Sequence, residues 1–406
     1  MEELLHIIKT SQAKLIKRIE PIQKKRNLFG EINRNLPCVG ILGERGLGKT
    51  TIMLQKLKEL GKGIYILGDL GIIKDKGLFT IVHYFYQEFN EKIFFIDEIH
   101  EYPNREKEIK NILDTLPDVK IVFSGSSSLS LQKKGADLSR RVLFYRLWPL
   151  NFQEYLYFQH NIKIKLYSFD DIIKNYKKIS YELSDIIKFT YLKNFMINGQ
   201  YPYAPLVSKE EFFMLLQNSI KKIIFQDIPN FINIETNTLL KLQDILYFIS
   251  QIPPSNLNYS SLARKTGIDP KQIAVFLEIL SDIGVINLLH KDQNLSNKLR
   301  KEKKIFLGNN NLVHMYNFFE GSQSELGTVR EVFIIDMLRR ISKSQMFLPG
   351  QYDIIYTYKG KTYTFEIGGK NKRINSKNVF IIKDDILIGT DNNIPLYLFG
   401  LIREKS

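Results

Sequence analysis

A glycine-rich stretch that ends in a lysine and a threonine is the first feature of the sequence that could do chemistry. Residues 43–50 read Gly-Glu-Arg-Gly-Leu-Gly-Lys-Thr, which matches the phosphate-loop pattern G-x-x-x-x-G-K-[ST]. Glycines let the backbone turn tightly and aim its N–H groups at anionic oxygens, and the N-terminus of a following helix adds positive charge. We expect Lys49 to reach the β- and γ-phosphates of a nucleotide and the Thr50 hydroxyl to hold Mg²⁺. The candidate nucleotide-binding residues of the loop are Gly43, Gly46, Gly48, Lys49, Thr50 and Thr51.

Two acidic residues follow a run of four apolar residues further along the chain. The run is Ile93–Ile96, and Asp97 and Glu98 come directly after it. Such a run predicts a buried parallel strand, and open α/β sheets bind ligands at the carboxyl ends of their strands. We expect Asp97 to hold Mg²⁺ and Glu98 to orient and deprotonate the attacking water. An acidic pair can also merely end a strand, but its position after a phosphate loop favours the functional interpretation.

Polar and basic residues after the next predicted strand complete the candidate site. A serine at its tip, Ser124 or Ser126, could bind the attacking water or the γ-phosphate, and we take Ser126 as the candidate. A Ser/Gly turn explains the same residues equally well. Further on, Arg141 could stabilise the transition-state charge of its own or a neighbouring subunit, although a solvated basic turn is the alternative.

The hydrophobic pattern predicts which elements position these residues. Over residues 36–150 short apolar runs alternate with helical patterns, which is typical of an α/β unit with a parallel sheet. A helix is expected at 51–60, directly after the glycine-rich loop. The predicted strands are Cys38–Leu42, Ile64–Leu67, Ile93–Ile96, Lys120–Ser124 and Val142–Arg146.

A compact helix–turn–helix pattern followed by a strand lies at residues 259–290. Asp269 is expected to cap the second helix, which starts at Pro270, because an acidic cap and a proline at the first position both favour helix initiation. In DNA-binding proteins of this kind the N-terminal end of the second helix enters the major groove. In ATPases the same unit also serves as a lid or a protein contact. The outward-facing candidates are Arg264, Lys271 and Gln272.

Composition limits the class of protein. The chain has 406 residues, of which 44% are hydrophobic and 25% charged, so we expect two or three folded domains. Its apolar runs are far shorter than the roughly 18 residues that span a bilayer. The N-terminus carries Glu2 and Glu3 and lacks the features of a signal peptide, and the single Cys38 excludes a disulfide framework and a cysteine-based zinc site. We therefore expect a cytoplasmic protein that does not enter the membrane.

The charge balance is strongly basic. Lysine and arginine total 58 against 43 acidic residues, a formal net charge of +15. Such an excess favours contact with polyanions, nucleic acid above all. Codon bias in an AT-rich genome is the alternative, because the chain is also rich in isoleucine and asparagine. The basic run 298–304 is the most concentrated part of this charge.

Together these motifs resemble a known family. The glycine-rich loop, Asp97–Glu98, the serines that follow residue 123, and Arg141 before Leu147-Trp148-Pro149-Leu150-Asn151-Phe152 are similar to the bacterial and archaeal AAA-domain ATPases with a companion C-terminal domain of unknown function. These are relatives of the AAA+ and STAND NTPases. Asn198-Gly199-Gln200-Tyr201-Pro202 resembles the Gly-Gly-x-Pro turn of the companion domain, with Gln200 in place of the second glycine. The stretch 365–372 resembles the ending of many members.

The tail also resembles restriction-endonuclease-like folds, whose metal site takes an aspartate, then Glu-x-Lys, and often an earlier helical glutamate. The corresponding residues are Glu331, Asp353 and Glu366, a candidate second metal site. Gly368 stands two positions after Glu366, where that pattern has lysine. Lys370 would have to take its place from a different point in the chain.

The resemblance implies an α/β P-loop NTPase, AAA+/STAND-like, with a parallel sheet, helical lid, winged helix and C-terminal restriction-endonuclease-like α/β domain. The predicted parts are N-terminal basic helices (1–35), the P-loop ATPase core (36–150), the lid (151–250), the winged helix (251–292) and the nuclease-like domain (293–406). We expect ATP and Mg²⁺ as cofactors and hydrolysis that rearranges the attached domains around nucleic acid. The alternatives are a STAND-like nucleotide switch acting on a protein partner and an ATP-regulated, metal-dependent DNase. We also expect the chain to associate with copies of itself as a homo-oligomer.

Overall fold

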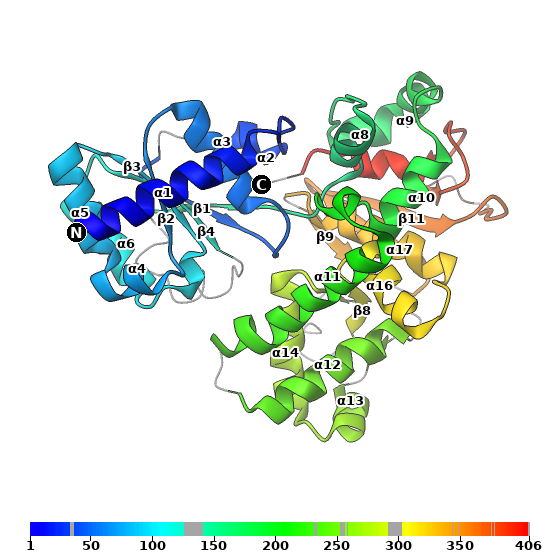
Figure 1. The fold of residues 1–406 in the computed structure, drawn as a ribbon. Coiled ribbons are helices and arrows are strands. Elements are labelled where there is room, and N and C mark those ends of the chain that lie inside the picture. The colour runs from blue at the N-terminus through cyan, green and yellow to red at the C-terminus, as the bar shows by residue number, and fades with distance from the viewer. Residues whose placement is uncertain are drawn as a thin grey trace. The chain divides into compact units, whose positions relative to one another are not determined.

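The chain folds into two compact units, Met1–Trp148 and Pro149–Lys405 (Figure 1). The computed structural model describes all residues except 33–35, 126–140, 231–233, 252–255, 258, 291–302, 343, 349, 375, 377 and 405–406. Within the described part, no helix combines the length and the apolar character needed to cross a membrane. The candidate Ser126 and most of the basic run 298–304 lie outside the described residues.

A five-stranded, fully parallel sheet forms the centre of the N-terminal unit. Its strand order is β2-β3-β4-β1-β5. All five strands were predicted to within one residue at either end, and the expected α/β architecture with a parallel sheet is confirmed. The strands are β1 (Cys38–Leu42), β2 (Ile64–Leu67), β3 (Ile93–Asp97), β4 (Lys120–Gly125) and β5 (Leu143–Arg146).

Helices pack against this sheet, and the long N-terminal helix α1 (Glu2–Ile19) runs along it (Figure 1). Leu4 and Ile8 of α1 are buried in the same apolar core as the strand residues. The close packing reaches the backbone: a Cβ atom at Gly40 would lie 2.7 Å from the Phe144 ring. The remaining helices of the unit are α2 (Leu28–Glu31), α3 (Lys49–Leu60), α4 (Gly71–Lys76), α5 (Leu78–Phe89), η1 (Ile99–Glu101) and α6 (Arg105–Thr115).

The C-terminal unit begins with helices and continues into a second sheet. The eight strands of that sheet have the order β13-β12-β11-β10-β9-β7-β8-β6. The helices are α8 (Phe152–His160), α9 (Phe169–Leu183), α10 (Phe189–Asn198), α11 (Lys209–Lys222), α12 (Thr236–Gln251), α13 (Tyr259–Thr266), α14 (Pro270–Ile283), α16 (Asn310–Glu320) and α17 (Leu326–Arg339). The strands are β6 (Asn256–Leu257), β7 (Ile286–His290), β8 (Lys303–Leu307), β9 (Ser344–Phe347), β10 (Ile354–Tyr358), β11 (Lys361–Gly368), β12 (Val379–Lys383) and β13 (Asn393–Pro395).

The predicted helix–turn–helix is present in α13 and α14. The Asp269 side chain accepts from the backbone N–H groups of Lys271 and Gln272, so α14 starts at Pro270 as expected. The next strand, β7, pairs antiparallel with β8, and β8 pairs antiparallel with β6. Since β8 lies beyond residue 292, the strands that follow α14 extend past the predicted end of the winged helix, and they belong to the eight-stranded sheet. The five-part division of the chain stays a prediction.

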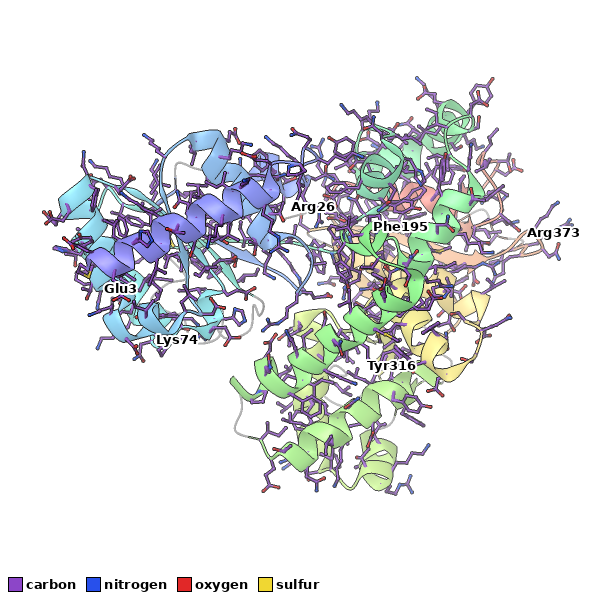
Figure 2. The ribbon with its side chains drawn as sticks, viewed as in Figure 1. Glu3, Arg26, Lys74, Phe195, Tyr316 and Arg373 are labelled. Carbon is purple, nitrogen blue, oxygen red and sulfur yellow. The ribbon has the colours of Figure 1, made fainter. Side chains whose placement is uncertain are left out.

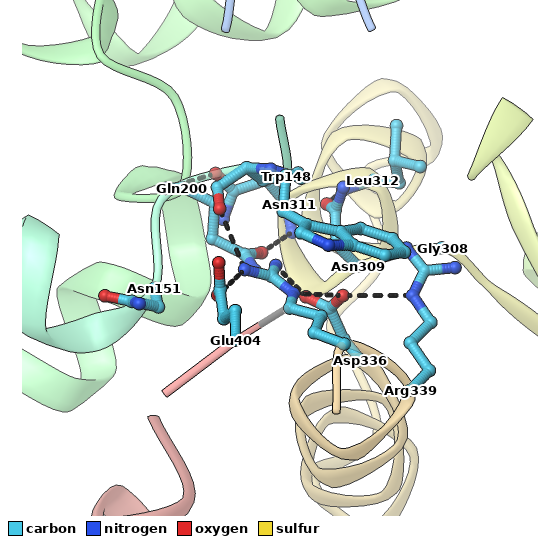
Figure 3. A network of polar contacts seen from close by, with 12 residues as sticks. Trp148, Asn151, Gln200, Gly308, Asn309, Asn311, Leu312, Asp336, Arg339 and Glu404 are labelled. Atoms are coloured by element: carbon cyan, nitrogen blue, oxygen red, sulfur yellow. Dashed lines mark hydrogen bonds and ion pairs between the residues drawn. The ribbon is translucent and has the colours of Figure 1, made fainter. Parts of the chain in front are cut away.

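A buried polar network joins α17 to three other parts of the C-terminal unit (Figure 3). Asp336, which is fully buried, forms an ion pair with Arg340 at 2.8 Å. The Gln200 side chain donates to the same carboxylate at 2.9 Å, and the Gln200 backbone N–H donates to Asn311. Arg339 lies 3.3 Å from Asp336 and donates to Asn287 on β7. Gln200, which departs from the glycine of the resembled turn, is therefore part of the core of this unit.

Candidate functional site

The glycine-rich loop connects β1 to α3, as the motif requires. Gly46 and Gly48 have φ angles of 81° and 94°, a region that favours glycine, and Gly48 is the residue before the first helical residue, Lys49. A Cβ atom at Gly43 would lie 2.5 Å from the backbone oxygen of Leu147. A side chain at Gly43 would therefore collide with that oxygen, and one at Gly46 or Gly48 would hold a strained backbone conformation.

The Lys49 side chain folds back over this loop. It is only 5% exposed, and its ammonium donates to the backbone oxygens of Gly43 at 2.9 Å and Glu44 at 2.8 Å. A buried cation is stable only with such partners. The loop therefore holds a fixed positive charge where its backbone N–H groups can meet an anion.

Asp97 is the centre of the polar contacts at the end of β3. One carboxylate oxygen accepts from Thr50 at 2.6 Å and from the Tyr65 hydroxyl. The other accepts from Ser124 and, at 3.2 Å, from the backbone N–H of Glu98. Asp97 is 2% exposed, so these donors compensate the burial of its charge. The structure thus brings the predicted pair Thr50 and Asp97 into direct contact.

Glu98 lies beside a neutral histidine. Its backbone has a φ of 52°, and its carboxylate is 3.2 Å from Nδ1 of His100. Burial lowers the pKa of His100 to about 3, and the positive charges of Arg45 and Lys49 act in the same direction. His100 therefore stays neutral at physiological pH, with its Nδ1 close to the Glu98 carboxylate.

Thr51 and Arg141 are the other predicted site residues of this unit that the structure describes. Thr51 lies in the first turn of α3 and is half-buried. Arg141 forms an ion pair at 2.5 Å with Asp114 of α6, and both side chains are substantially exposed. A role for Arg141 at a nucleotide stays a prediction.

The chemistry of the donor set at β3 suits a magnesium ion. Mg²⁺ is a hard cation that takes oxygen ligands, commonly one or two side chains together with nucleotide phosphates and water. The Thr50 hydroxyl and the Asp97 carboxylate supply such oxygens side by side, next to the loop that carries Lys49. The residues present therefore fit a Mg–nucleotide complex.

The C-terminal acidic residues also lie together, but with a different lysine from the one expected. The Lys372 ammonium is 2.6 Å from Glu366 and 3.6 Å from Asp353. Lys370 was expected here and this is wrong: its side chain is exposed, and its backbone N–H donates to Asp385. The chain turns after β11, so a lysine six positions after Glu366 reaches back to it, whereas a lysine four positions after does not.

Glu331 of α17 belongs to the same neighbourhood. Burial, together with the negative charge of Asp353, raises its pKa to about 7. Asp353 is held in place by the backbone N–H of Ile367, which donates to it at 2.7 Å. The three acids of the predicted second metal site thus interact electrostatically.

Sequence reasoning missed two residues of the nucleotide site. Tyr65 was assigned to an apolar strand, and Ser124 was considered only as a contact to water or phosphate. Both instead bind the Asp97 carboxylate. Burial and the Asp97 charge raise the pKa of Tyr65, so its hydroxyl keeps its proton and donates. Tyr65 is in register with Phe95, two residues before Asp97, whereas Ser124 follows the register partner of Ile96, so no common spacing in the sequence marks the two hydroxyls.

Comparisons with known proteins agree with this site. Residues 35–156 match the family model described as AAA domain, and residues 190–322 match a domain of unknown function, DUF8612. The chain therefore combines an AAA domain with a C-terminal domain of unknown function, as the resemblance implied. The fold and the match together define an AAA-type P-loop domain with a five-stranded parallel sheet, followed by a further sheet domain.

Two of the similar proteins are uncharacterized proteins of one archaeon. One, from Methanocaldococcus jannaschii, is 28% identical over 282 residues, which cover 65% of this chain and 59% of the relative. A second from the same organism is 27% identical over 292 residues, 70% of this chain and 60% of the relative. The chain thus spans about three-fifths of the length of these relatives. A solved structure of a RuvB variant from Thermotoga maritima matches at 16% identity with a TM-score of 0.29, covering 72% of this chain and 93% of that one.

The contact between Tyr65 and Asp97 generates a prediction about magnesium. Tyr65→Phe removes one donor from the carboxylate without changing the shape of the core. Losing an outer partner of a metal ligand typically weakens metal affinity about 10-fold or more. We expect the Mg²⁺ concentration for half-maximal nucleotide binding to rise by that factor in a Mg²⁺ titration. Tyr84→Phe, on α5, is the matched control. An unchanged Mg²⁺ requirement in Tyr65→Phe would show that Tyr65 does not position Asp97.

Proposed function

We propose that this protein is a cytoplasmic, Mg²⁺-dependent ATPase that uses hydrolysis to rearrange its attached domains on nucleic acid. The observation that carries the proposal is the 2.6 Å hydrogen bond between Thr50 and Asp97, which joins the end of the phosphate loop to the end of β3. The AAA domain match supports nucleotide binding. The proposal goes beyond this match in three respects: the hydrolysis of ATP, the contact with nucleic acid and the movement of the attached domains.

Each residue of the site has a role in this proposal. The loop N–H groups and Lys49 bind the phosphates, and Thr50 and Asp97 hold the metal. When bound, Mg²⁺ neutralises charge on the phosphates. Glu98 orients a water molecule and takes its proton as it attacks, with neutral His100 beside its carboxylate. A nucleotide switch that does not hydrolyse has no need of such a base, so Glu98 favours an ATPase.

Arg141 is proposed as the residue that stabilises the transition-state charge. It would have to leave its exposed ion pair with Asp114 to do so. Exposed pairs of this kind contribute little to stability, so the contact is easily exchanged. Whether Arg141 serves its own subunit or a neighbouring one follows from the oligomeric state.

The proposed contact with nucleic acid rests on charge and on the α13–α14 unit. The chain carries a net charge of +15. The helix order α12-α13-α14, followed by the β7–β8 hairpin with β6 on its edge, supports a winged helix. Arg264, Lys271 and Gln272 are exposed on it. Lys271 and Gln272 lie at the N-terminal end of α14, the end that reads bases in proteins of this kind.

Two alternatives remain distinct from this proposal. A nucleotide switch acting on a protein partner would bind ATP without nucleic acid. An ATP-regulated, metal-dependent DNase is favoured by one specific observation, the approach of Lys372 to both Glu366 and Asp353, because lysine beside two carboxylates is the donor set of the restriction-endonuclease-like sites. In that case Glu331, Asp353 and Glu366 would hold the metal.

Substitutions in the phosphate site separate binding from hydrolysis. Lys49→Ala removes the fixed positive charge of the loop, so we expect it to abolish ATP binding. Glu98→Gln keeps the shape but cannot take a proton, and losing a general base typically costs about 10²- to 10⁴-fold in rate. We expect Glu98→Gln to bind ATP like the wild type and to lose turnover by that factor, measured by calorimetry and by phosphate release. Turnover at the wild-type rate would show that Glu98 is not the base.

Arg141 is tested together with its ion-pair partner. If Arg141 acts on the transition state, Arg141→Ala should reduce turnover by roughly 10³-fold with little change in ATP affinity. Asp114→Ala breaks the same ion pair but leaves the arginine, so its turnover should stay at the wild-type level. Equal losses in both variants would indicate that the pair is structural.

Salt dependence tests the nucleic-acid contact. Each phosphate contact that binding neutralises contributes roughly 0.9 to the slope of log affinity against log salt. We expect wild-type affinity for duplex DNA to fall steeply with salt, and Arg264→Ala combined with Lys271→Ala to reduce the slope by roughly 1.8. Lys178→Ala combined with Lys193→Ala, on exposed helices α9 and α10, removes equal charge and should leave the slope unchanged.

The outcome of this DNA assay also separates the alternatives. No binding at low salt would favour the protein-partner switch and assign the net charge to codon bias. Mg²⁺-dependent cleavage that disappears in Lys372→Ala would favour the DNase.

A further inference from the structure

Gln12 is a polar residue on the face of α1 that packs into the N-terminal unit. Glu3, labelled in Figure 2, lies in the first turn of this helix, and Leu4 and Ile8 are buried in the apolar core. Residues four positions apart lie on the same face of a helix, so Gln12 continues the row that Leu4 and Ile8 begin. A half-buried amide on such a face needs hydrogen-bond partners within the protein.

The partners of Gln12 belong to the backbone at the start of β2. Its side-chain Nε2 donates to the backbone oxygen of Gly63 at 3.3 Å, and its Oε1 accepts from the backbone N–H of Tyr65 at 2.8 Å. The strand order β2-β3-β4-β1-β5 places β2 at the edge of the sheet. An edge strand presents backbone groups that no further strand pairs, and Gln12 binds two of them.

The two bonds reproduce the pattern of a neighbouring parallel strand. In a parallel pair, a residue donates to the oxygen just before its partner residue and accepts from the N–H just after it. Gln12 makes the same two contacts on either side of Ile64, with one side-chain amide in place of a backbone residue. Strand β2 is therefore held by β3 on one side and by α1 on the other.

The start of β2 gains a fixed position from these bonds. Gly61 and Gly63 have φ angles of 65° and 117°, so the backbone that leads into the strand has the conformational freedom of glycine. A Cβ atom at Gly63 would lie 3.0 Å from the backbone oxygen of Ile93, which shows how closely the chain approaches β3 here. The Gln12 amide fixes the chain at the point where this freedom ends.

Tyr65 connects the Gln12 contact to the metal site. The residue whose backbone N–H binds Gln12 is also the residue whose hydroxyl donates to Asp97. Tyr65 is 2% exposed, so its ring is enclosed by the core and its hydroxyl moves with the strand backbone. The position of β2 therefore determines how well the hydroxyl meets the carboxylate.

We propose that Gln12 is a positioning residue of the Mg–nucleotide site, acting through the backbone of β2 and the Tyr65 hydroxyl on Asp97. The N-terminal helix is then part of what shapes the metal site. When the Gln12 contacts are lost, β2 can shift relative to β3, Asp97 loses a well-directed donor, and the affinity for Mg²⁺ falls. This inference rests on the proposed function, because it requires Mg²⁺ and a nucleotide at the site.

Gln12→Leu tests the contact, because leucine has a similar size but no hydrogen-bonding groups. We expect the Mg²⁺ concentration for half-maximal nucleotide binding to rise several-fold, but by less than the roughly 10-fold expected of Tyr65→Phe, since the hydroxyl is still present. Nucleotide affinity at saturating Mg²⁺ should change far less. Gln87→Leu, the same replacement at an exposed position on α5, is the matched control and should keep the wild-type Mg²⁺ requirement.

A double variant separates positioning from a general loss of stability. If Gln12 acts through the Tyr65 hydroxyl, Gln12→Leu should have no further effect on the Mg²⁺ requirement once Tyr65→Phe has removed that hydroxyl. A purely structural role for Gln12 would lower the melting temperature and leave the Mg²⁺ requirement unchanged. Equal effects of Gln12→Leu on the Mg²⁺ requirement with and without the hydroxyl would also overturn the inference.

Gln12→Glu keeps the inference testable if Gln12→Leu does not fold. Glutamate retains an oxygen that can accept from Tyr65 but has no N–H for Gly63, so its Mg²⁺ requirement should lie between those of the wild type and Tyr65→Phe. A wild-type Mg²⁺ requirement in Gln12→Glu would contradict the inference and leave the proposed function intact. Absence of Mg²⁺-dependent nucleotide binding in the wild type would instead overturn both.

Discussion

The carboxylate of Asp97 lies buried at the end of a central strand, where an unpaired charge would cost far more than the fold could supply. Its two oxygens are satisfied by hydroxyls from Thr50, Tyr65 and Ser124 and by a backbone N–H. Tyr65 and Ser124 come from the strands on either side of β3, and Thr50 comes from the start of α3. The strand order β2-β3-β4 is therefore what allows the charge to be buried, and the buried charge in turn holds the phosphate loop against the sheet.

Much of the N-terminal unit could be predicted because its signals are local. A phosphate loop must follow a strand and precede a helix, and the five apolar runs of this unit each correspond to one strand. The donors to Asp97 could not be predicted in the same way, because Tyr65 within an apolar strand looks like any core aromatic. Which side chains meet across a sheet depends on the strand order and register, and a single sequence determines neither.

Less of the C-terminal unit could be predicted from the sequence. The helix α14 and its cap were predictable, since Asp269, Pro270 and Gly284 are local signals. The role of Lys372 was not, because the path of the chain after β11 decides which lysine returns to Glu366. Arg340 was equally hidden. It donates to a backbone oxygen far away in the sequence, and no periodicity or motif marks a partner of that kind.

The central claim is that a nucleotide binds at the loop together with the metal that Thr50 and Asp97 hold. Calorimetric titration of the full-length protein with ATP, in the presence and absence of Mg²⁺, tests it most directly. The account predicts saturable binding of one ATP per chain, with affinity that rises when Mg²⁺ is added. Absence of saturable binding, or an affinity indifferent to Mg²⁺, would contradict it.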